Sequence, residues 1–344
     1  MKAIIYHQLG DPSVLRLVDR DVLAPGPGEV RVRIFVSGVN PTDWKSRRGS
    51  SASGQPLPFP EVVPNQDGAG VVDAVGVGVG NIKVGDRVWL ALAAYQRASG
   101  GTAQEFAVLP AERVFALPDL ASFDLGASLG VPAITAYRAL TIAEDGPRRL
   151  HPGALSGKVV LVAGGAGAVG HAAIQLARWA GATVITTVSG PVKAALATAA
   201  GAHHVVNYKK LDPATEIRRM APDGVDLVVE VAPAQNAELN LAVIRNRGSI
   251  AVYANNGGDK MTLDVRKHFS LNVRYQFLLL YTMGGDVLLV AAKDINAAIV
   301  DGAMPVGEES GLPLHRFDLA HTADAHAAVE GNVIGKVLID VTAQ

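Results

Sequence analysis

The sequence predicts an α/β protein of about two domains, one rich in β-strands and one with a parallel sheet between helices. Its 344 residues are more than one domain usually contains. Up to about residue 120, apolar and polar side chains alternate as they do in half-buried strands. From Lys158 onward, predicted strands and helices alternate along the chain, which is typical of a parallel sheet with helices on both faces.

The clearest strand of the first part spans residues 28–38. Its valines and isoleucine alternate with Arg31 and Arg33, so one face is apolar and the other is charged. A turn rich in Pro and Gly precedes this strand. Two further strands are expected, one at residues 68–76, whose glycines allow close packing or bends, and a short one that ends residues 83–89.

The second part begins with helices and continues as a strand–helix alternation. Two helices are expected at residues 124–130 and 133–140, and a loop or insertion covers residues 145–157. The expected strands of the sheet are residues 159–162, 182–188, 205–206, 226–230 and 248–253. A helix at residues 323–330 and a closing strand at residues 336–341 complete the pattern.

A glycine-rich turn follows the strand at residues 159–162 and precedes a predicted helix at residues 171–180. Gly165, Gly167 and Gly170 have the G-x-G-x-x-G spacing of a dinucleotide-binding turn. In such a turn the first glycine makes the tight turn, the second lets the backbone approach a pyrophosphate, and the third lets the helix pack on the strand. The alternative is an ordinary strand–helix joint in a chain rich in Gly and Ala, but the βαβ context favours cofactor binding.

The charge of the next segment predicts NADP(H) rather than NAD(H). An NAD site usually has an Asp or Glu about 20 residues beyond the glycines, on the ribose 2′-hydroxyl. Residues 188–190 occupy that place here, and residues 146–211 contain no Asp or Glu. The same span contains Lys193, Lys209 and Lys210, whose ammonium groups would attract a 2′-phosphate. The alternative is that these lysines only form a solvated surface.

Composition excludes several classes of function. The net charge of −1 and the pI near 6.8 give no basic surface typical of nucleic-acid binding. The absence of cysteine excludes disulfides, thiolate metal ligands, iron–sulfur clusters and a cysteine nucleophile. No apolar run reaches membrane-spanning length, and the first residues are too short for a signal peptide. A cytoplasmic protein with no membrane or nucleic-acid partner is therefore expected.

Several short motifs occur together and in order along the chain. They are residues 38–43, 67–72, 83–88 and 135–140, the glycine turn, residues 224–230 and the pair Gly335-Lys336. From Met1 to Val341 this pattern resembles the medium-chain dehydrogenase/reductase superfamily, and more narrowly its zinc-independent quinone oxidoreductase branch, the zeta-crystallin-like proteins. The resemblance implies a GroES-like β-barrel catalytic domain at residues 1–121 and 280–344, and a Rossmann doubly wound parallel-sheet domain at residues 122–279. It also implies a homodimer that pairs through residues 271–277 at the sheet edge.

The resemblance further implies a set of residues that contact NADP(H). They are, along the chain, Asn40 and Thr135 at the nicotinamide and substrate, Gly165, Ala166, Gly167, Ala168 and Val169 at the diphosphate, Ser189, Lys193 and Tyr208 around the 2′-phosphate, Tyr253, Ala254 and Asn255 near the nicotinamide ribose, Phe277 and Leu278 near the carboxamide, and Lys336 near the cofactor.

No metal site is expected. Metal-dependent relatives have Cys at the place of Asn40, a Gly-His-Glu motif at the place of residues 65–67, and a lobe with four cysteines. This chain has none of these ligands, and zinc needs thiolate, imidazole or carboxylate in a tight tetrahedron. The adjacent His203 and His204 are expected to be ordinary loop histidines. Many relatives have Tyr at the place of Lys45, so the preferred substrate stays open.

The leading hypothesis is an NADPH-dependent reductase that passes hydride to a quinone or an α,β-unsaturated carbonyl. Such acceptors form stable oxyanions, so alignment and hydrogen-bond donors can replace a metal. Asn40 is the first candidate donor. Lys45 is the second, although it lies in a basic turn that could simply be solvated. No dedicated proton donor is evident, and water could serve for a quinone.

Two alternatives stay open at this point. One is an enoyl or 2-alkenal double-bond reductase, which uses the same cofactor and the same kind of donor. The other is a protein without catalysis, such as an NADPH-binding sensor, a structural protein or an RNA-binding protein. An intact glycine turn is expected for an enzyme and for a sensor alike, whereas the near-neutral charge does not favour RNA binding.

Overall fold

The computed structural model describes residues 1–49, 57 and 59–342, and their contacts divide into two compact units. The first unit contains residues 1–131, 284–289 and 314–344, and the second contains residues 132–283 and 290–313. The sequence predicts boundaries at 121/122 and 279/280. The main difference from that prediction is that residues 290–313 group with the second unit.

The first unit is built on a mostly antiparallel sheet of seven strands that the C-terminal strands complete. Along the sheet the order is β14-β15-β3-β4-β5-β7, and β6 pairs with β3. The strands are β3 (Glu29–Val39), β4 (Asp67–Val75), β5 (Arg87–Leu90), β6 (Phe106–Pro110), β7 (Val114–Ala116), β14 (Leu314–Asp318) and β15 (Lys336–Asp340). This is the GroES-like domain that the resemblance implies.

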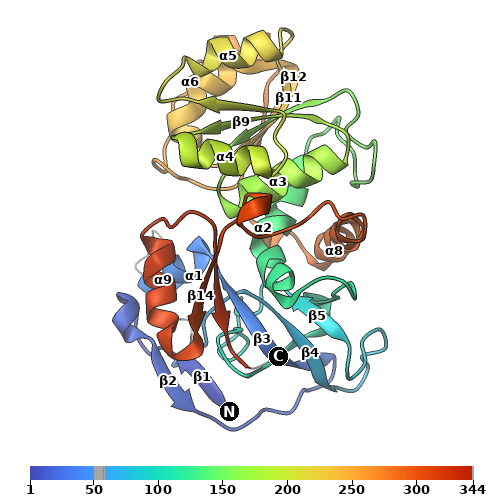
Figure 1. The fold of residues 1–344 in the computed structure, drawn as a ribbon, viewed down its shortest axis with the longest axis vertical. Helices are drawn as coiled ribbons and strands as arrows, with labels where there is room; N and C mark the ends of the chain where they lie inside the picture. Colours follow the sequence, from blue (N-terminus) through green and yellow to red (C-terminus); the bar gives the residue numbers. More distant parts are fainter. Residues whose placement is uncertain (50–56, 58, 343–344) are drawn as a thin grey trace. The chain divides into compact units, whose positions relative to one another are not determined.

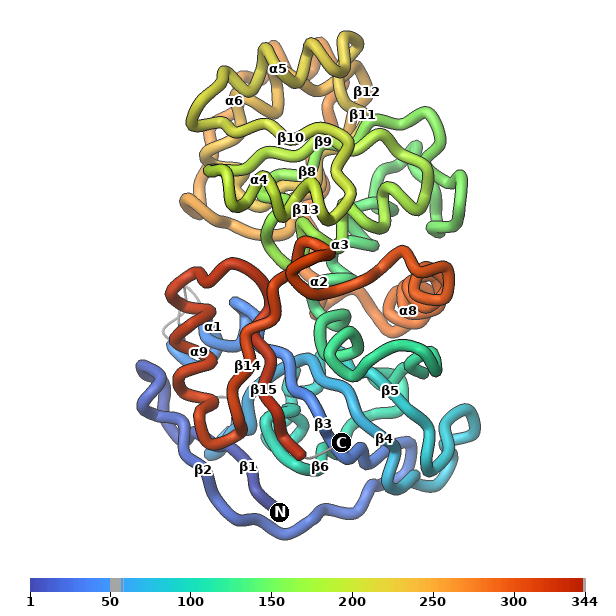
Figure 2. Tube along the Cα trace, viewed as in Figure 1, coloured from blue at the N-terminus to red at the C-terminus, as the bar shows by residue number. Residues whose placement is uncertain are grey.

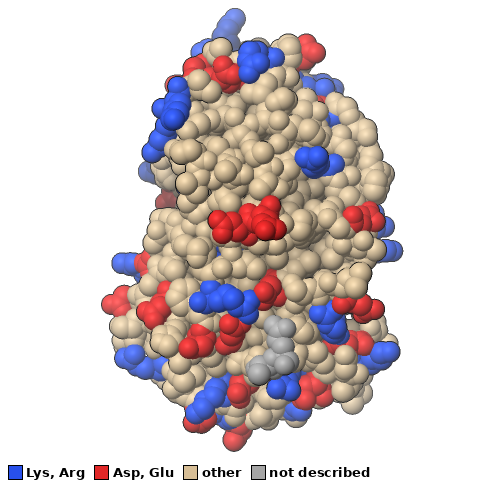
Figure 3. Space-filling model, in the orientation of Figure 1, with Lys and Arg blue, Asp and Glu red and all other residues tan. Residues whose placement is uncertain are grey.

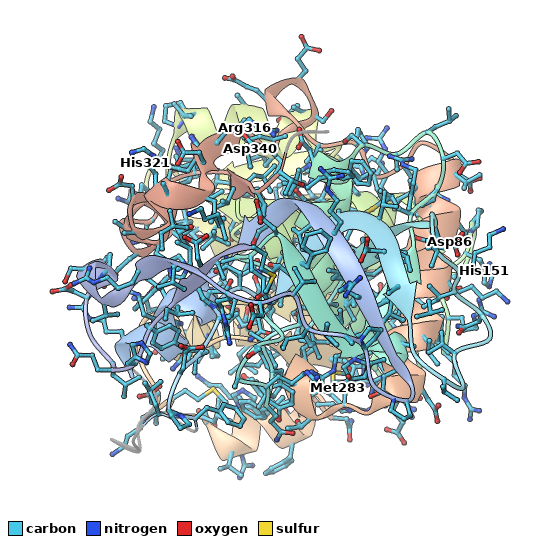
Figure 4. The ribbon with its side chains drawn as sticks, turned by 90° about the horizontal axis from the view of Figure 1, so that it is seen from below. Asp86, His151, Met283, Arg316, His321 and Asp340 are labelled. Carbon is cyan, nitrogen blue, oxygen red and sulfur yellow. The ribbon has the colours of Figure 1, made fainter. Side chains whose placement is uncertain are left out.

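Strand β3 organises this unit because it pairs with three others. Val30, Val32 and Ile34 are fully buried and form part of the core, as the alternation in the sequence predicts. Strand β15 pairs antiparallel with the end of β3, while β14 lies parallel to β15 at the sheet edge. Figure 4 shows Arg316 and Asp340 side by side on these two strands, where the Arg316 Nε donates to the Asp340 Oδ2 at 3.2 Å.

Smaller elements surround the sheet of the first unit. They are the hairpin β1 (Lys2–Ile5) and β2 (Arg16–Asp19), the helices α1 (Pro41–Arg48) and α9 (Thr322–Glu330), and the 3₁₀ turns η1 (Pro12–Val14), η2 (Ala111–Arg113) and η5 (Leu319–His321). Arg47 on α1 is fully buried and its Nη2 donates to Glu330 on α9 at 2.7 Å, so the two helices are tied together.

The second unit is a doubly wound parallel sheet of six strands. The strands are β8 (Val159–Ala163), β9 (Thr183–Val188), β10 (His204–Asn207), β11 (Val225–Glu230), β12 (Ile244–Val252) and β13 (Arg274–Phe277). Their spatial order is β10-β9-β8-β11-β12-β13, so the direction of winding reverses between β8 and β11. This is the strand order of a Rossmann domain, and ligands bind at the carboxyl ends of the strands at such a reversal.

Helices cover both faces of the parallel sheet. They are α3 (Ala168–Trp179), α4 (Pro191–Ala199), α5 (Pro213–Met220), α6 (Pro233–Val243) and the short α7 (Val265–Ser270). Figure 1 shows α3 and α4 on one face of this sheet and α5 and α6 on the other. The tube in Figure 2 shows the strands β8, β9 and β10 between them.

Two longer helices each have residues in both units. They are α2 (Phe123–Thr141) and α8 (Gly285–Val300), with the 3₁₀ turns η3 (Leu280–Thr282) and η4 (Glu308–Ser310) near α8 in the sequence. In the second unit, the buried Asp294 on α8 accepts from the Tyr137 hydroxyl on α2 at 2.7 Å. This bond gives a physical reason why residues beyond 289 group with the second unit.

Helix α2 is one continuous helix, whereas the sequence predicts two helices at residues 124–130 and 133–140. Pro132 lies inside it and removes one backbone hydrogen bond. Most side chains from Ala127 to Leu140 are nevertheless buried, so packing outweighs the missing bond. The prediction of two helices is therefore wrong at this point.

Surface charge is mixed, and no described helix is suited to a bilayer. Figure 3 shows Lys and Arg interspersed with Asp and Glu over one face of the molecule, without a large field of one sign. Among the helices of the described residues, none combines the length and the apolar character that crossing a membrane requires.

Candidate functional site

The glycine turn after β8 has a distinct reason for each of its glycines. Gly164 has a φ of 72°, which favours glycine, and Gly165 is a central residue of the turn that the Gly167 N–H closes onto the Gly164 oxygen at 3.0 Å. A Cβ on Gly165 would lie 2.2 Å from the Thr186 Oγ1 on β9, and a Cβ on Gly170 would lie 2.4 Å from the Gly164 carbonyl oxygen. These two glycines are therefore required for packing between strand and helix.

Gly167 is different, because none of the described residues requires a glycine there. It is the N-cap of α3 with a φ of −84°, and a Cβ would have no neighbour closer than the Gly164 oxygen at 3.5 Å. The first turn of α3 contains no acidic side chain, and no side chain caps its N–H groups. An open space beside a helix N-terminus with unsatisfied N–H groups fits a diphosphate.

Most of the sequence-predicted cofactor residues of the second unit lie along one edge of its sheet. Residues 165–169 follow β8, Ser189 follows β9, Tyr208 follows β10, residues 253–255 follow β12, Phe277 ends β13 and Leu278 follows it. The carboxyl ends of parallel strands meet at the same edge. The sheet thus brings together residues that lie more than 100 positions apart in the sequence.

The environment of Lys193 fits a 2′-phosphate. Lys193 lies in the first turn of α4, just after Ser189, and both residues are half-buried. Within the described part of the chain, the Lys193 ammonium forms no ion pair or hydrogen bond, so no carboxylate neutralises its charge. Tyr208 is 48% exposed, and its backbone N–H donates to the Val188 oxygen, which holds the end of β10 beside the end of β9.

Glu230 also lies at this edge of the sheet. The sequence includes it in the motif at residues 224–230 but predicts no role for it. It ends β11, next to the reversal of the sheet, and it is fully buried. Its carboxylate accepts from the Ala232 N–H at 2.6 Å, the Asn236 Nδ2 at 3.0 Å and the Asn240 Nδ2 at 2.6 Å. These three bonds fix the backbone that leaves β11 at the reversal.

The first unit holds a second candidate site, a buried polar cluster of Asn40, Asp67 and Lys336. Asn40 directly follows β3, Asp67 begins β4 and Lys336 begins β15. The sheet register pairs Gly38 with Asp67 and Val39 with Val337, so three strand ends converge. The three side chains are at most 2% exposed.

The polar cluster is closed by hydrogen bonds. The Lys336 Nζ donates to the Asn40 Oδ1 at 2.8 Å and lies 3.5 Å from the Asp67 Oδ2. The Asn40 Nδ2 donates to the same Asp67 Oδ2 at 2.7 Å. Burial raises the pKa of the Asp67 carboxyl and lowers the pKa of the Lys336 ammonium, and each charge partly offsets the effect on the other.

Two glycines make room for the polar cluster. A Cβ on Gly130 would lie 2.1 Å from the Asp67 Oδ1, and the next residue, Val131, donates its backbone N–H to that oxygen at 2.8 Å. A Cβ on Gly38 would lie 2.1 Å from the Ala127 carbonyl oxygen and 3.1 Å from the Lys336 Nζ. The cluster therefore depends on the close approach of α2 and β3.

Asp43 is a second buried carboxylate beside Asn40. Its Oδ2 accepts from the Asn40 backbone N–H at 2.7 Å and its Oδ1 accepts from the Gln66 N–H at 3.1 Å. Desolvation, with the Asp67 charge as a second cause, raises the pKa of Asp43 to about 8, while these N–H bonds act in the opposite direction. Asp43 thus fixes the start of α1 and with it the backbone of Asn40.

A chain of hydrogen bonds also ends at Asp67. The Asp67 carbonyl oxygen can only accept, and it accepts from the Thr102 Oγ1 at 2.6 Å. Ser37 Oγ therefore donates to Thr102 at 2.7 Å, and the Asn65 Nδ2 donates to Ser37 at 3.0 Å. The Asn65 Oδ1 then accepts from the His326 Nε2 at 2.8 Å. The chain fixes the backbone of Asp67 from the side opposite its carboxylate.

Some predicted residues do not join the polar cluster. Lys45 on α1 is half-buried, and its ammonium lies 5.9 Å from the centre of the Trp44 ring. Thr135 is buried in α2 and belongs to the second unit. Asp67 is a site residue that the sequence does not predict as such, although a charged residue at the start of a glycine-rich buried strand is a signal for it.

Histidines and carboxylates do not assemble into a metal centre in the described residues. Three or more His, Asp or Glu side chains that could hold a metal ion do not occur together there. His203 instead accepts from the Val184 backbone N–H through its Nδ1 at 3.0 Å.

Comparison with known proteins agrees with both units. The family model of the alcohol dehydrogenase GroES-like domain matches residues 26–119, and that of the zinc-binding dehydrogenase matches residues 168–291. The quinone oxidoreductase of Rattus norvegicus is 34% identical over 342 residues, which cover 98% of this chain and 97% of the relative.

Solved structures of similar proteins match over the whole chain. Escherichia coli quinone oxidoreductase complexed with NADPH superposes with a TM-score of 0.81 at 26% identity, covering 99% of this chain and 100% of the other. A 2-haloacrylate reductase superposes with a TM-score of 0.80 at 27% identity, covering 100% of both chains.

Proposed function

Since this chain belongs to the quinone oxidoreductase branch of the medium-chain dehydrogenase/reductase superfamily, we propose that it is an NADPH-dependent reductase that transfers hydride to a quinone or a similarly electron-poor carbonyl without zinc. The observation that carries this proposal is the presence of two candidate sites, one for the cofactor and one for the acceptor. One is a glycine turn with open space beside Gly167, and the other is a buried polar cluster that offers hydrogen bonds.

NADP(H) fits the residues at the edge of the parallel sheet. The backbone at Gly167 and the N-terminus of α3 would hold the diphosphate, and Lys193 with Ser189 would hold the 2′-phosphate. The chemistry that NADPH supplies is a hydride with its two electrons, and it leaves as NADP⁺. The acceptor gains that hydride and one proton from solvent, so a quinone becomes a hydroquinone.

Asn40 is the group that we propose to act on the acceptor. Its Nδ2 carries two hydrogens, and Asp67 accepts one of them. The second can donate to the oxygen on which negative charge develops during hydride transfer. A donor that is 2% exposed acts in a medium of low dielectric constant, where such a bond is stronger than in water.

The polar cluster itself argues for chemistry without zinc. It contains the Lys336 ammonium, 2.8 Å from the Asn40 Oδ1. A divalent cation at the same place would meet that positive charge at close range, and the cluster offers neither thiolate nor imidazole. The fixed ammonium and the amide supply the electrostatic stabilisation that a metal supplies elsewhere.

A second candidate activity is reduction of an activated carbon–carbon double bond. The likeness to a 2-haloacrylate reductase over the whole chain favours it. Hydride addition to such a double bond gives an enolate, whose oxygen would need the same donor from Asn40. A sensor or an RNA-binding role is less well supported, because the surface charge is mixed and the net charge is −1.

An acceptor screen tests the proposal directly. Oxidation of NADPH is followed with 9,10-phenanthrenequinone, with 2-alkenals and with 2-haloacrylate, for the wild type and for Asn40→Ala. We expect quinone turnover that falls by about 100-fold in the variant, as for the loss of one oxyanion donor. Turnover confined to the alkenals or haloacrylate would favour the second activity, and NADPH binding without any turnover would favour a sensor.

We also propose that the protein is a cytoplasmic homodimer that pairs through β13. This strand lies at the edge of the parallel sheet, where Phe277 and Leu279 are 65% and 59% exposed. Sedimentation equilibrium should give twice the mass of the chain, and Phe277→Lys should shift it toward a monomer. Cell fractionation tests the location.

A further inference from the structure

The side chain of Asn40 could adopt two orientations of the same shape, related by a flip of its amide. Its two neighbours allow only one of them. The Lys336 ammonium has three hydrogens and no acceptor, so it must face the Asn40 oxygen. The Asp67 carboxylate is an acceptor only, so it must face the Asn40 nitrogen. The flipped amide would place donor against donor and acceptor against acceptor.

We propose that Asp67 and Lys336 are positioning residues that fix the Asn40 amide with its nitrogen free to donate one hydrogen to the reacting oxygen. In the part of the chain that the structure describes, Asp67 is the acceptor for one Nδ2 hydrogen and the other hydrogen has none. This inference rests on the proposed function, because it explains how that function obtains its donor.

Asp67 is itself held too firmly to follow a flipped amide. Its Oδ1 accepts from the Val131 N–H, and Gly130 leaves the space that brings this N–H within 2.8 Å. Its carbonyl oxygen accepts from Thr102 at the end of the hydrogen-bond chain from His326. With both ends of Asp67 fixed, the Oδ2 that faces Asn40 has a defined position.

Lys336 differs here from a residue that binds the cofactor. Its side chain is 1% exposed, and its ammonium contacts Asn40 and Asp67. A residue that binds a cofactor phosphate changes the dissociation constant of NADPH when it is replaced. A residue that orients Asn40 changes kcat with a bound cofactor and leaves that constant nearly as it was.

Asp67→Asn is the sharpest variant because it keeps the shape and reverses one hydrogen bond. The new amide must turn its oxygen to the Val131 N–H, so its nitrogen faces the Asn40 nitrogen. Asn40 must then flip and present its nitrogen to the Lys336 ammonium, or stay and face a second donor. Either outcome removes the preference for the active orientation.

The expected result for Asp67→Asn and for Lys336→Met is a fall of kcat by ten-fold to 100-fold, with NADPH dissociation constants within about two-fold of wild type. Lys336→Arg keeps a donor and should recover part of kcat. In the Asn40→Ala background neither change should lower kcat further, because both act through the same amide. Asp294→Asn is the matched control. Asp294 is another buried carboxylate that has a cationic partner, and its replacement should leave kcat unchanged.

Two results would overturn the proposal. One is a ten-fold weaker NADPH affinity of Lys336→Met with normal kcat at saturation, which would make Lys336 a cofactor ligand. The other is an equal loss from Asp67→Asn with and without Asn40, which would give Asp67 a separate role.

An NMR readout keeps the test independent of the acceptor. The side-chain amide signals of Asn40, assigned by their absence in Asn40→Ala, should shift strongly in Asp67→Asn and in Lys336→Met but not in Asp294→Asn. If the wild type reduces none of the acceptors, the proposed function fails, and this readout still decides whether the pair orients the amide. Unchanged Asn40 signals in both variants would refute the orientation.

Discussion

At the scale of single residues, two buried histidines have consequences for acid stability. His326 is fully buried, and its Nδ1 has no partner within the described residues, so a proton there would find no acceptor. Burial lowers the pKa of His326 to about 3 and that of His171, which bonds the Ser310 oxygen, to about 4. Both values lie below the 6.5 of an unfolded chain, so the unfolded state binds more protons as the pH falls below 6.5.

We therefore predict that the free energy of unfolding falls as the pH is lowered from 6.5 towards 4. Each of the two histidines should contribute about 1.4 kcal/mol per pH unit well below 6.5. Urea denaturation at a series of pH values measures this slope. His326→Gln keeps a donor towards Asn65 and should remove one contribution, whereas the exposed His151→Gln should not change the slope. An identical slope in both variants would contradict the assignment.

Lys193, whose ammonium has no ion-pair partner in the described part of the chain, leads to a prediction about cofactor choice. Lys193→Glu exchanges attraction for repulsion at the 2′-phosphate, so it should weaken NADPH by at least ten-fold and NADH much less. Titration of nicotinamide fluorescence measures both constants. Lys83→Glu makes the same change of charge on the first unit and should affect neither cofactor. If both cofactors weaken alike in Lys193→Glu, the residue supports the scaffold and not the phosphate pocket.

At the scale of elements, the glycine turn separates ligand binding from packing. Gly167→Val has space for its side chain in the protein but occupies the place of the diphosphate, so it should abolish NADPH binding and retain the wild-type circular dichroism. Gly170→Ala is the matched control, because its Cβ would collide with the Gly164 oxygen and destabilise the turn itself. Normal NADPH affinity of Gly167→Val would show that the diphosphate lies elsewhere.

The contact between α2 and β4 gives a second prediction at this scale. Gly130→Ala would place a Cβ 2.1 Å from the Asp67 Oδ1 and must displace either the helix or the carboxylate. We expect a loss of about 1–3 kcal/mol in the free energy of unfolding together with a lower kcat. Gly80→Ala, where the Cβ meets nothing within 4 Å, is the control and should change neither quantity. Wild-type kcat in Gly130→Ala would mean that the Asp67 position does not matter for turnover.

How far the sequence predicts the structure depends on whether the signal is local. The alternation at residues 28–38 predicts β3, and the glycine turn between strand and helix predicts the first βα joint, because each pattern lies within a short window. Asn40, Asp67 and Lys336 form a cluster only through the register of β3 with β4 and β15, which no window of the sequence contains. Pro132 locally favours a break in the helix and so leads to the wrong prediction of two helices. The burial of side chains on both sides of it keeps α2 continuous.

At the scale of the whole molecule, the chemistry of the chain predicts activity without a metal. The chain has no cysteine, and the polar cluster holds an ammonium where a cation would be repelled. Elemental analysis of the purified protein should find no stoichiometric zinc, and EDTA should leave NADPH oxidation unchanged. Activity that EDTA removes and zinc restores would overturn the assignment.

The pairing of β3 with β15 also determines when the sheet of the first unit can be completed during synthesis of the chain. Asn40 and Lys336 are bonded across a separation of 296 positions in the chain. At the usual 5–20 residues per second, a ribosome needs about 15 to 60 s to travel that distance. The parallel sheet emerges within this interval and is free to fold first. Residues 29–33 of β3 can already pair with β6, but residues 36–39, which pair with β15, wait unpaired. The emerging chain is therefore most exposed to aggregation and to chaperones before β15 arrives, and the polar cluster is among the last parts of the protein to form.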